Sequence, residues 1–351
     1  MINILIVDDS ETETKILKFL FESESDIKII GTAKNGKEAI ALLSSLKPDL
    51  ITMDIQMPLM DGFETSRYIM QHHPIPIVVV SAFAKNKELN TVYNALAAGA
   101  LCVIEKPTNI TAPNFEYTRK QIVSTIRAMA EIKVVKRRFT TNLEHKNITS
   151  IAQPAITAAH YEIIGIGTSV GGPQALKLIL SELPSDFPVP IVIVQHMALG
   201  FISSFSHWLN ENTQLKIKEA EQGEILAKST VYFAPDLYHL EIERSHSQLI
   251  AKLVSAKPVS GFCPSATVLL GSIARTCGKQ GIGILLTGMG SDGAEGLLEL
   301  KHAHGHTIIQ DPKSAVVFGM AGVAQSLGAV DTIVELTHMA NYLKQLFQHP
   351  I

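Results

Sequence analysis

Short apolar runs rich in β-branched residues alternate with segments of helical pattern along most of this 351-residue chain. In the first half the strand-like runs lie at 3–7, 27–31, 50–53, 75–80 and 100–104, and the helix-like segments lie near 11–22, 35–46, 62–72, 87–98 and 114–130. Strands that alternate with helices form parallel sheets covered by helices on both faces, with function at the carboxyl ends of the strands. The pattern therefore predicts five strand–helix units.

The alternation resumes after residue 160, with strand-like runs at 162–167, 190–195, 230–234, 248–254, 281–287 and 306–310. The helical segments of this half lie near 173–183, 200–211, 265–277 and 293–303. We expect an α/β protein with two doubly wound parallel sheets, a flavodoxin-like (βα)5 domain followed by a Rossmann-like domain. The predicted boundaries are 1–125 for the first domain, 126–159 for a basic helical linker and 160–349 for the second domain.

Charge and cysteine content exclude several classes of protein. The chain has 30 Lys and Arg residues against 33 Asp and Glu residues, so no global field favours nucleic acid or an anionic membrane. Basic residues gather at 116–160, but the stretch has only two aromatic residues, Tyr117 and Phe139, and no helix-turn-helix pattern follows, so a DNA-binding role is not expected. Three cysteines without metal-ligand spacing argue against disulfides or zinc. We expect a cytoplasmic protein without direct membrane insertion, whose partner is another protein or a small molecule.

Polar residues stand at the ends of the predicted strands of the first domain. Asp8 and Asp9 follow the first strand, Asp54 the third, Ser81 the fourth and Lys106 the fifth. Carboxylates gathered at one edge repel one another unless a hard divalent cation neutralises them, which implies Mg²⁺. With the cation present, Asp54 could attack a phosphoryl donor while Ser81 and Lys106 bind the phosphoryl oxygens. The expected product is an aspartyl phosphate.

A hydroxyl stands between glycines in Gly167-Thr168-Ser169-Val170-Gly171, directly after a predicted strand and before a helix. Such a turn lifts a serine clear of the sheet, where a nearby base can take its proton. Two further predicted strands end in His196 and Asp292, so Ser169, His196 and Asp292 could form a catalytic triad. The glycines around Met289 would let backbone N–H groups approach an oxyanion.

Two alternatives use the same residues differently. Gly288-x-Gly290-x-x-Gly293 follows a strand, precedes a helix and has Asp311 after the next strand, which matches the spacing of a dinucleotide-binding fingerprint. In a second alternative the triad has the order serine, aspartate, histidine. Its base would then be one of three histidines that follow Asp292, namely His302, His304 or His306.

The first half resembles the response-regulator receiver family through Val7-Asp8-Asp9-Ser10, Met53-Asp54 with Met57-Pro58 and Asp61-Gly62, Ser81-Ala82 and Lys106-Pro107. The resemblance implies that a histidine kinase phosphorylates Asp54, and that Asp9 and Asp54 hold Mg²⁺ with support from Asp8. Many receivers place an aromatic switch residue three positions before the lysine, where this chain has Val103. Movement of Ser81 and its loop would then carry the signal.

Residues 160–349 resemble the chemotaxis protein-glutamate methylesterase family, in which a receiver domain usually precedes the catalytic domain. The motifs are Gly165-Ile166-Gly167-Thr168-Ser169 with Gly171-Gly172-Pro173, Gln195-His196-Met197, Thr287-Gly288-Met289-Gly290-Ser291-Asp292-Gly293, Tyr232-Phe233-Ala234-Pro235 with His239, Pro264-Ser265, and Gln310-Asp311 with Gly319-Met320. The likeness implies a nucleophile at Ser169, a base at His196, an orienting acid at Asp292 and an oxyanion contact from the Met289 backbone. The implied activity is phosphorylation-controlled hydrolysis of glutamate methyl esters on chemoreceptors, with glutamine deamidation possible and no organic cofactor.

Several positions depart from this family near the implied substrate cleft, namely Val170, Cys263, Thr267, Ala321 and Gly322. Each change removes a polar or a stiff group, which affects substrate preference and rate more than the triad. Cys263 is expected to be a packed residue rather than a second nucleophile. The departures leave open an alternative in which the second half binds receptors as a signalling adaptor without turnover.

Overall fold

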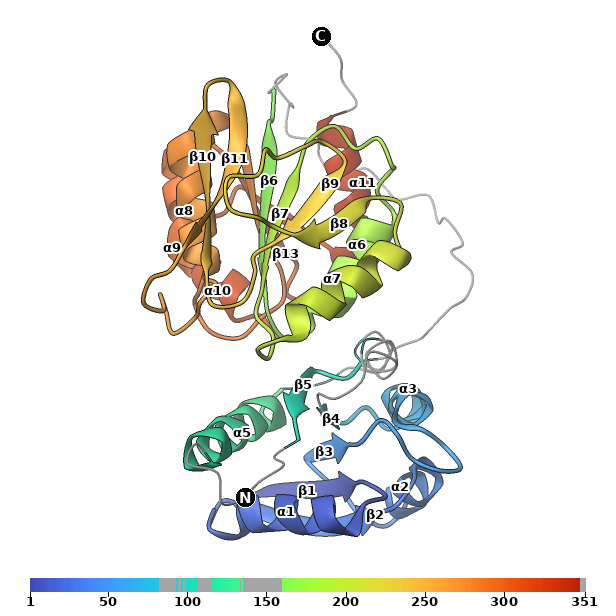
Figure 1. Ribbon diagram of the computed structural model, residues 1–351. Coiled ribbons are helices and arrows are strands. Elements are labelled where there is room, and N and C mark those ends of the chain that lie inside the picture. Colours follow the sequence, from blue (N-terminus) through green and yellow to red (C-terminus); the bar gives the residue numbers. More distant parts are fainter. Residues whose placement is uncertain are drawn as a thin grey trace. The chain divides into compact units, whose positions relative to one another are not determined.

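The computed structural model describes residues 1–81, 93, 96, 99–106, 115–132, 134 and 160–347. The chain divides into two compact units, Met1–Thr140 and Thr141–Ile351 (Figure 1). No helix of the described residues is long and apolar enough to cross a membrane. Most of the predicted linker lies outside the described residues.

The first unit contains a five-stranded sheet with the order β2-β1-β3-β4-β5, and all of its strand pairs are parallel. Its strands are β1 (Ile2–Val7), β2 (Ile27–Ala33), β3 (Leu50–Met53), β4 (Ile77–Ser81) and β5 (Cys102–Glu105). The strand order reverses between β1 and β3, so their carboxyl ends open on the crevice where ligands bind in such sheets. The doubly wound fold predicted for this half is confirmed.

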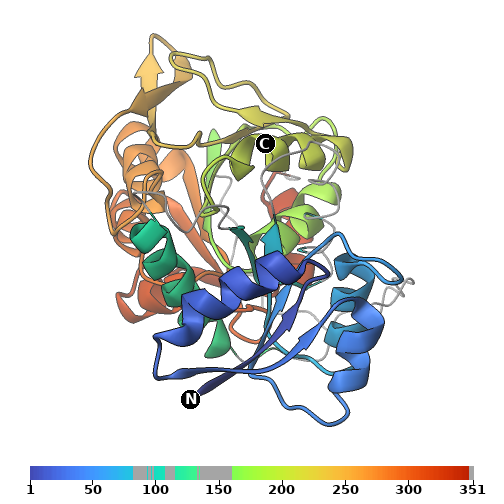
Figure 2. The same ribbon diagram turned by 60° about the horizontal axis from the view of Figure 1, so that its bottom comes forward.

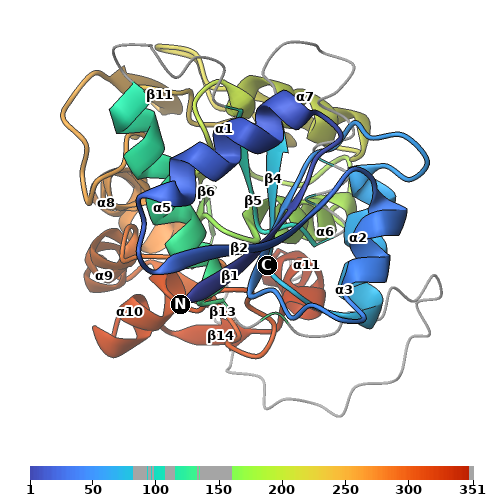
Figure 3. The same cartoon turned by 90° about the horizontal axis from the view of Figure 1, so that it is seen from below.

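Helices cover both faces of this sheet. They are α1 (Glu11–Glu22), α2 (Gly36–Leu42), α3 (Gly62–His72) and α5 (Phe115–Ala130). Helix α1 packs beside α5 on one face, and α2 packs beside α3 on the other (Figure 3). Helices α1, α2 and α3 each begin soon after a strand and are capped by a side-chain oxygen, from Ser10, Asn35 and Asp61 respectively.

The second unit contains a seven-stranded parallel sheet with the order β14-β13-β12-β6-β7-β9-β8. Its strands are β6 (Ile163–Thr168), β7 (Ile191–Gln195), β8 (Lys216–Glu219), β9 (Thr230–Phe233), β12 (Gly281–Leu285), β13 (His306–Gln310) and β14 (Thr332–Val334). The strand order reverses between β6 and β12, which are buried on both faces. Such strands are apolar throughout, as the continuous runs in the sequence predict.

Two layers of helices enclose the second sheet. They are α6 (Gly172–Ser181), α7 (Phe201–Glu211), α8 (Ala266–Cys277), α9 (Ala294–His302), α10 (Met320–Ser326) and α11 (Leu336–Leu346), with a short 3₁₀ turn, η1, at Gly278–Gln280. Helices α8, α9 and α10 pack together on one face, and α6 and α11 pack together on the other (Figure 1). The predicted Rossmann-like α/β architecture is confirmed.

One predicted strand lies outside the parallel sheet. The run at 248–254 is β11 (Gln248–Val254), and it pairs in antiparallel fashion with β10 (His239–Ser245). Two residues connect these strands, which is too short for the crossover that parallel pairing requires. The hairpin packs on α8, at the edge of the second unit (Figure 2, gold strands).

Helices α8 and α9 approach the second sheet closely because two facing positions lack side chains. Gly165 of β6 and Gly283 of β12 are paired in register. A Cβ at Gly165 would lie 2.4 Å from Ile273 Cδ1, and one at Gly283 would lie 2.6 Å from Leu300 Cδ2. Side chains there would push the helices away from the sheet. The start of α8 is thus fixed close to the end of β12.

The substitution Leu270→Ala tests this close packing, because Leu270 is fully buried and would contact a Cβ at either glycine. We expect a loss of about 2–5 kcal/mol in the free energy of unfolding, from lost burial plus the cavity left behind. Trp208, the one tryptophan of the chain, is buried in α7 and reports unfolding of the second unit by fluorescence. The control Leu327→Ala changes a side chain that is 45% exposed, and should shift stability by no more than about 0.5 kcal/mol. Equal shifts would contradict the packing argument.

Candidate functional sites

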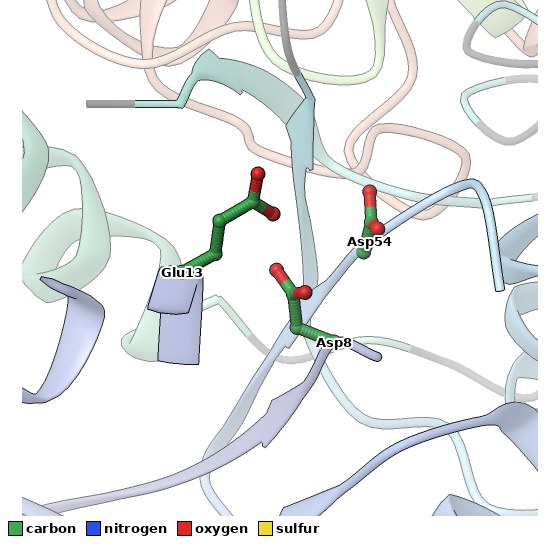
Figure 4. Close-up of side chains that lie close together, drawn as sticks. All are labelled: Asp8, Glu13 and Asp54. Carbon is green, nitrogen blue, oxygen red and sulfur yellow. The ribbon is translucent and has the colours of Figure 1, made fainter. Parts of the chain in front are cut away.

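Three carboxylates meet at the carboxyl ends of β1 and β3 in the first unit. Asp8 directly follows β1, Asp54 directly follows β3, and Glu13 lies in the first turn of α1. One carboxylate oxygen from each lies within 4.8 Å of the others. Figure 4 shows Glu13 reaching from its helix toward the two aspartates. Asp8 and Asp54 lie at strand ends, as the sequence predicts, whereas Glu13 is not among the predicted residues.

The ammonium of Lys106 lies among these carboxylates. Its Nζ lies 3.3 Å from Asp8 Oδ2 and 3.1 Å from Asp54 Oδ1, and it forms a further ion pair with Glu13. Lys106 follows β5 and is 8% exposed. One buried positive charge thus faces three negative charges. The pocket retains an excess of negative charge when all three carboxylates are ionised.

The pKa values of the pocket reflect the burial of its charged groups. Burial raises the pKa of Asp8 to about 7; the Lys106 charge opposes this rise, and the Asp54 charge adds to it. Burial also raises the pKa of Asp54, against the opposing effect of Lys106. Burial alone would lower the pKa of Lys106, but the hydrogen bond with Glu13 and the charges of Asp54 and Asp8 raise it. The lysine is therefore held in its charged form.

The pocket fits a divalent cation. Asp8 Oδ2 is buried and accepts no hydrogen bond from the described residues, so it has lone pairs to spare. Carboxylate oxygens are the protein ligands that Mg²⁺ takes. Asp9 is exposed and is not one of the three clustered carboxylates, so its role as a ligand stays a prediction. Ser81 ends β4, and its side chain lies outside the described residues.

The sequence contained a signal for Glu13, but it favoured a different role. Ser10-x-x-Glu13 matches a capping box, in which the glutamate binds the backbone N–H of the serine. Ser10 Oγ does accept from the Glu13 N–H at 3.3 Å, as half of that motif requires. The Ser10 N–H instead donates to Asp8 Oδ1 at 2.9 Å. The Glu13 carboxylate is thereby left to bind Lys106.

In the second unit, Ser169 stands at the turn between β6 and α6. Gly171 caps α6 with φ +78°, a left-handed conformation that glycine adopts without strain, and Pro173 lies in the first turn. The Ser169 N–H donates to the Thr287 carbonyl at 3.1 Å. A Cβ at Gly288 would lie 2.9 Å from Ser169 Cβ, so the β12 loop passes directly against the serine.

His196 follows β7, next to β6 in the sheet. Its N–H donates to the Thr168 carbonyl at 2.9 Å, which holds the histidine beside the serine turn. Its Nε2 lies 2.9 Å from Asp292 Oδ2, while Nδ1 has no hydrogen-bond partner among the described residues. The imidazole stacks on the Phe262 ring, with centroids 3.8 Å apart and planes 2° apart. The ring is held on one face and at one nitrogen, and the other nitrogen can accept a proton.

Asp292 is completely buried, and the start of α8 supplies its donors. Its carboxylate accepts from Ser265 Oγ at 2.6 Å, from the Ala266 N–H at 2.7 Å and from the Thr267 N–H at 3.1 Å. Burial would raise the pKa of Asp292, but hydrogen bonds from His196, Ser265 and Ala266 outweigh burial and lower it. The carboxylate therefore stays ionised and can stabilise a protonated His196.

The glycine loop after β12 is built around the serine. The Gly288 N–H donates to the Val317 carbonyl at 3.0 Å, and the Gly288 carbonyl accepts from the N–H groups of Gly319 and Met320. The next residue, Met289, is 44% exposed, and the oxyanion role of its N–H stays a prediction. The loop that matched the dinucleotide fingerprint also carries Asp292, whose side chain is committed to α8 and His196.

The alternative order of triad residues does not describe this site, since Asp292 binds His196. His302 ends α9, His304 follows that helix, and His306 begins β13. The amino end of β13 is the opposite end of the parallel sheet from the turn after β12. His306 there hydrogen-bonds Tyr342 across 2.8 Å.

The positions that depart from the family pattern have distinct surroundings. Thr267 keeps a polar role, because its Oγ1 accepts from the Gly293 N–H at 2.7 Å. Cys263 is partly buried, and burial raises the pKa of its thiol, which disfavours the reactive thiolate. Val170 is buried, and its carbonyl accepts from Thr287 Oγ1 at 2.8 Å. These contacts keep the serine turn and the Asp292 loop joined.

Comparisons with known proteins show which proteins the two units are similar to. A family model described as CheB methylesterase matches residues 164–343, and one described as response regulator receiver domain matches residues 4–112. A protein-glutamate methylesterase/protein-glutamine glutaminase 2 of Methanospirillum hungatei is 41% identical over 99% of this chain and 98% of its own length. A protein-glutamate methylesterase/protein-glutamine glutaminase of Nitrosospira multiformis is 40% identical over 99% and 97%. The CheB methylesterase catalytic domain of Thermotoga maritima covers 53% of this chain and 98% of its own, with 34% identity and a TM-score of 0.52.

The substitution Ser265→Ala tests how α8 supports Asp292. Removing a hydrogen bond to a buried charge costs about 1.5–3 kcal/mol, so we expect labelling of Ser169 by a fluorophosphonate to slow by about tenfold or more. Ser272→Ala is the matched control, since Ser272 is buried in the same helix and its hydroxyl bonds Ile242 and Leu269 instead. The control should lose stability, read by Trp208 fluorescence, and keep the labelling rate. Equal labelling of both variants and wild type would show that Ser265 does not act on the site.

Proposed function

The chain belongs to the CheB methylesterase family and carries a receiver domain ahead of its catalytic domain, and from this we propose that it hydrolyses glutamate γ-methyl esters on chemoreceptors under control of phosphorylation. The products are glutamate and methanol. Deamidation of glutamine follows the same route, with ammonia as the leaving group. The observation that carries the proposal is the His196–Asp292 pair, with a free imidazole nitrogen, beside the Ser169 turn.

In the first step Ser169 Oγ attacks the ester carbonyl as its proton passes to His196. Nε2 is bound to Asp292, so Nδ1 is the nitrogen that takes the proton. The ionised Asp292 stabilises the resulting imidazolium, and the Met289 N–H receives the oxyanion. The tetrahedral intermediate then expels methoxide, which leaves as methanol with the proton from His196.

The second step returns the enzyme to its starting state. His196 removes a proton from water, and the hydroxide attacks the carbonyl of the acyl-serine. Collapse of this intermediate breaks the bond to Ser169 Oγ, which recovers its proton from His196. The phenyl ring of Phe262 lies flat against the His196 imidazole. The imidazole therefore keeps its orientation through both proton transfers.

Control lies in the receiver domain, which implies a kinase as phosphoryl donor. We assign this donor to a histidine kinase of a chemotaxis-type pathway in the cytoplasm. An Asp54 oxygen bonds to phosphorus as the phosphohistidine P–N bond breaks, and Lys106 and Ser81 bind the phosphoryl oxygens. Asp54 and Asp9, with support from Asp8, would hold Mg²⁺, which would neutralise part of the charge of the transferred group. A tenfold rise in the active population requires a shift of about 1.4 kcal/mol, within reach of one such set of contacts.

Methanol release from methylated chemoreceptor membranes tests the catalytic assignment. We expect Ser169→Ala and His196→Ala to lower turnover by about 10⁴-fold or more, because nucleophile and base act as one unit. Ser203→Ala, at an exposed position of α7, should retain the wild-type rate. If well-folded wild-type protein releases no methanol, the adaptor alternative is favoured instead.

A phosphoryl donor with Mg²⁺ tests the control by Asp54. We expect methanol release by the wild type to rise with donor, and Asp54→Asn to show no rise because it lacks the acceptor oxygen. Asp49→Asn makes the same change at an exposed position near the other end of β3 and should respond like the wild type. A donor-dependent rise that survives in Asp54→Asn would place the phosphorylation site elsewhere.

A further inference from the structure

Glu13 stands at the opening of the phosphorylation pocket. Its side chain is 36% exposed, whereas those of Asp8 and Asp54 are 1% and 9% exposed. It lies in the first turn of α1, and its carboxylate points toward both aspartates (Figure 4). Its usual capping partner, the Ser10 N–H, is taken by Asp8 Oδ1. Glu13 can therefore move toward or away from the pocket without breaking the cap that Ser10 provides.

The ammonium of Lys106 has as many donors as it has carboxylate neighbours. It carries three N–H groups, and its ion pairs are with Asp8, Asp54 and Glu13. Phosphoryl oxygens on Asp54 compete with these carboxylates for the same ammonium, which Glu13 holds by a hydrogen bond. Asp8 is fixed by the Ser10 N–H and Asp54 by the Ile55 N–H, at 2.9 Å and 2.7 Å. Glu13 is the most exposed of the three carboxylates, and it is the one that is free to move away from Lys106.

Charge acts in the same direction as hydrogen bonding. A phosphoryl group adds negative charge to a site that already has three carboxylates around one lysine. The Glu13 charge lies within ion-pair distance of the same ammonium, where the local dielectric is low enough for repulsion to matter. A neutral side chain at this position would remove the repulsion and free one donor of Lys106.

We propose that Glu13 is the resting counter-ion of Lys106 and thereby limits how tightly the pocket binds a phosphoryl group. This role of Glu13 rests on the proposed phosphorylation of Asp54. Glu13 leaves Lys106 when Asp54 is phosphorylated. The energy of the Lys106–Glu13 pair is subtracted from that of the Lys106–phosphoryl contact.

The test uses the full-length protein and beryllofluoride, which binds an aspartate oxygen as a phosphoryl group does. Its affinity is measured by ¹⁹F NMR titration at saturating Mg²⁺ for wild type, Glu13→Gln and Glu11→Gln. We expect Glu13→Gln to bind beryllofluoride about tenfold more tightly, since one charge-assisted hydrogen bond no longer competes. Glu11→Gln is the matched control, because Glu11 lies in the same turn but pairs with the exposed Lys34 at 2.8 Å.

The measured affinities for beryllofluoride either support or overturn the role of Glu13. Tighter binding by Glu13→Gln with wild-type affinity in Glu11→Gln supports the proposal. Unchanged affinity overturns it, weaker affinity overturns it in favour of Glu13 as a cation ligand, and equal tightening in both variants reduces it to a general charge effect. Asp54→Asn serves as the reference for the site itself. If wild type and Asp54→Asn bind beryllofluoride equally well, the proposal that Asp54 is phosphorylated is also wrong.

Discussion

The burial of the Asp292 carboxylate constrains the second unit more than any other interaction. A completely buried charge is tolerated only where hydrogen-bond donors replace water, and here His196, Ser265 and two N–H groups at the start of α8 do so. The start of α8 must therefore lie against the β12 loop. Gly165 and Gly283 allow this approach, because a Cβ at either would collide with α8 or α9. The positions of the helix, the loop and the histidine thus follow from one charge.

The two charged sites of the chain are opposites in their hydrogen bonding. Asp292 has an excess of donors, so its pKa is lowered and its carboxylate is ionised and oriented in the resting protein. The pocket of the first unit has an excess of acceptors, so burial raises the pKa of Asp8 and of Asp54. The first arrangement is complete before substrate arrives, as a hydrolytic site requires. The second is left short of positive charge, as suits a site that is completed by a cation and a transferred group.

Much of both sites could be predicted from the sequence because parallel sheets place their functional residues after strands. That rule found Asp8, Asp54 and Lys106, which the structure brings together, and the His196–Asp292 pair. It missed Phe262, which stacks on His196, and Ser265, which begins a predicted helix rather than following a strand and bonds Asp292. Both contacts join residues that lie far apart in sequence. It also missed Glu13, because Ser10-x-x-Glu13 is fully explained by local capping. The run at 248–254 has the composition of a strand, but only the length of its turn shows that it pairs with β10.

Local helix energetics and pocket chemistry coincide at Glu13. An acidic side chain in the first turn stabilises a helix by interacting with its dipole, whatever lies beyond the helix end. Glu13 therefore gives α1 part of its stability while its carboxylate binds Lys106. When a phosphoryl group takes the lysine, Glu13 can still remain in the first turn, where the dipole and solvent receive its charge. Lys106 can thus exchange the Glu13 carboxylate for a phosphoryl group without unfolding the start of α1. The interaction lost in this exchange is the Lys106–Glu13 ion pair.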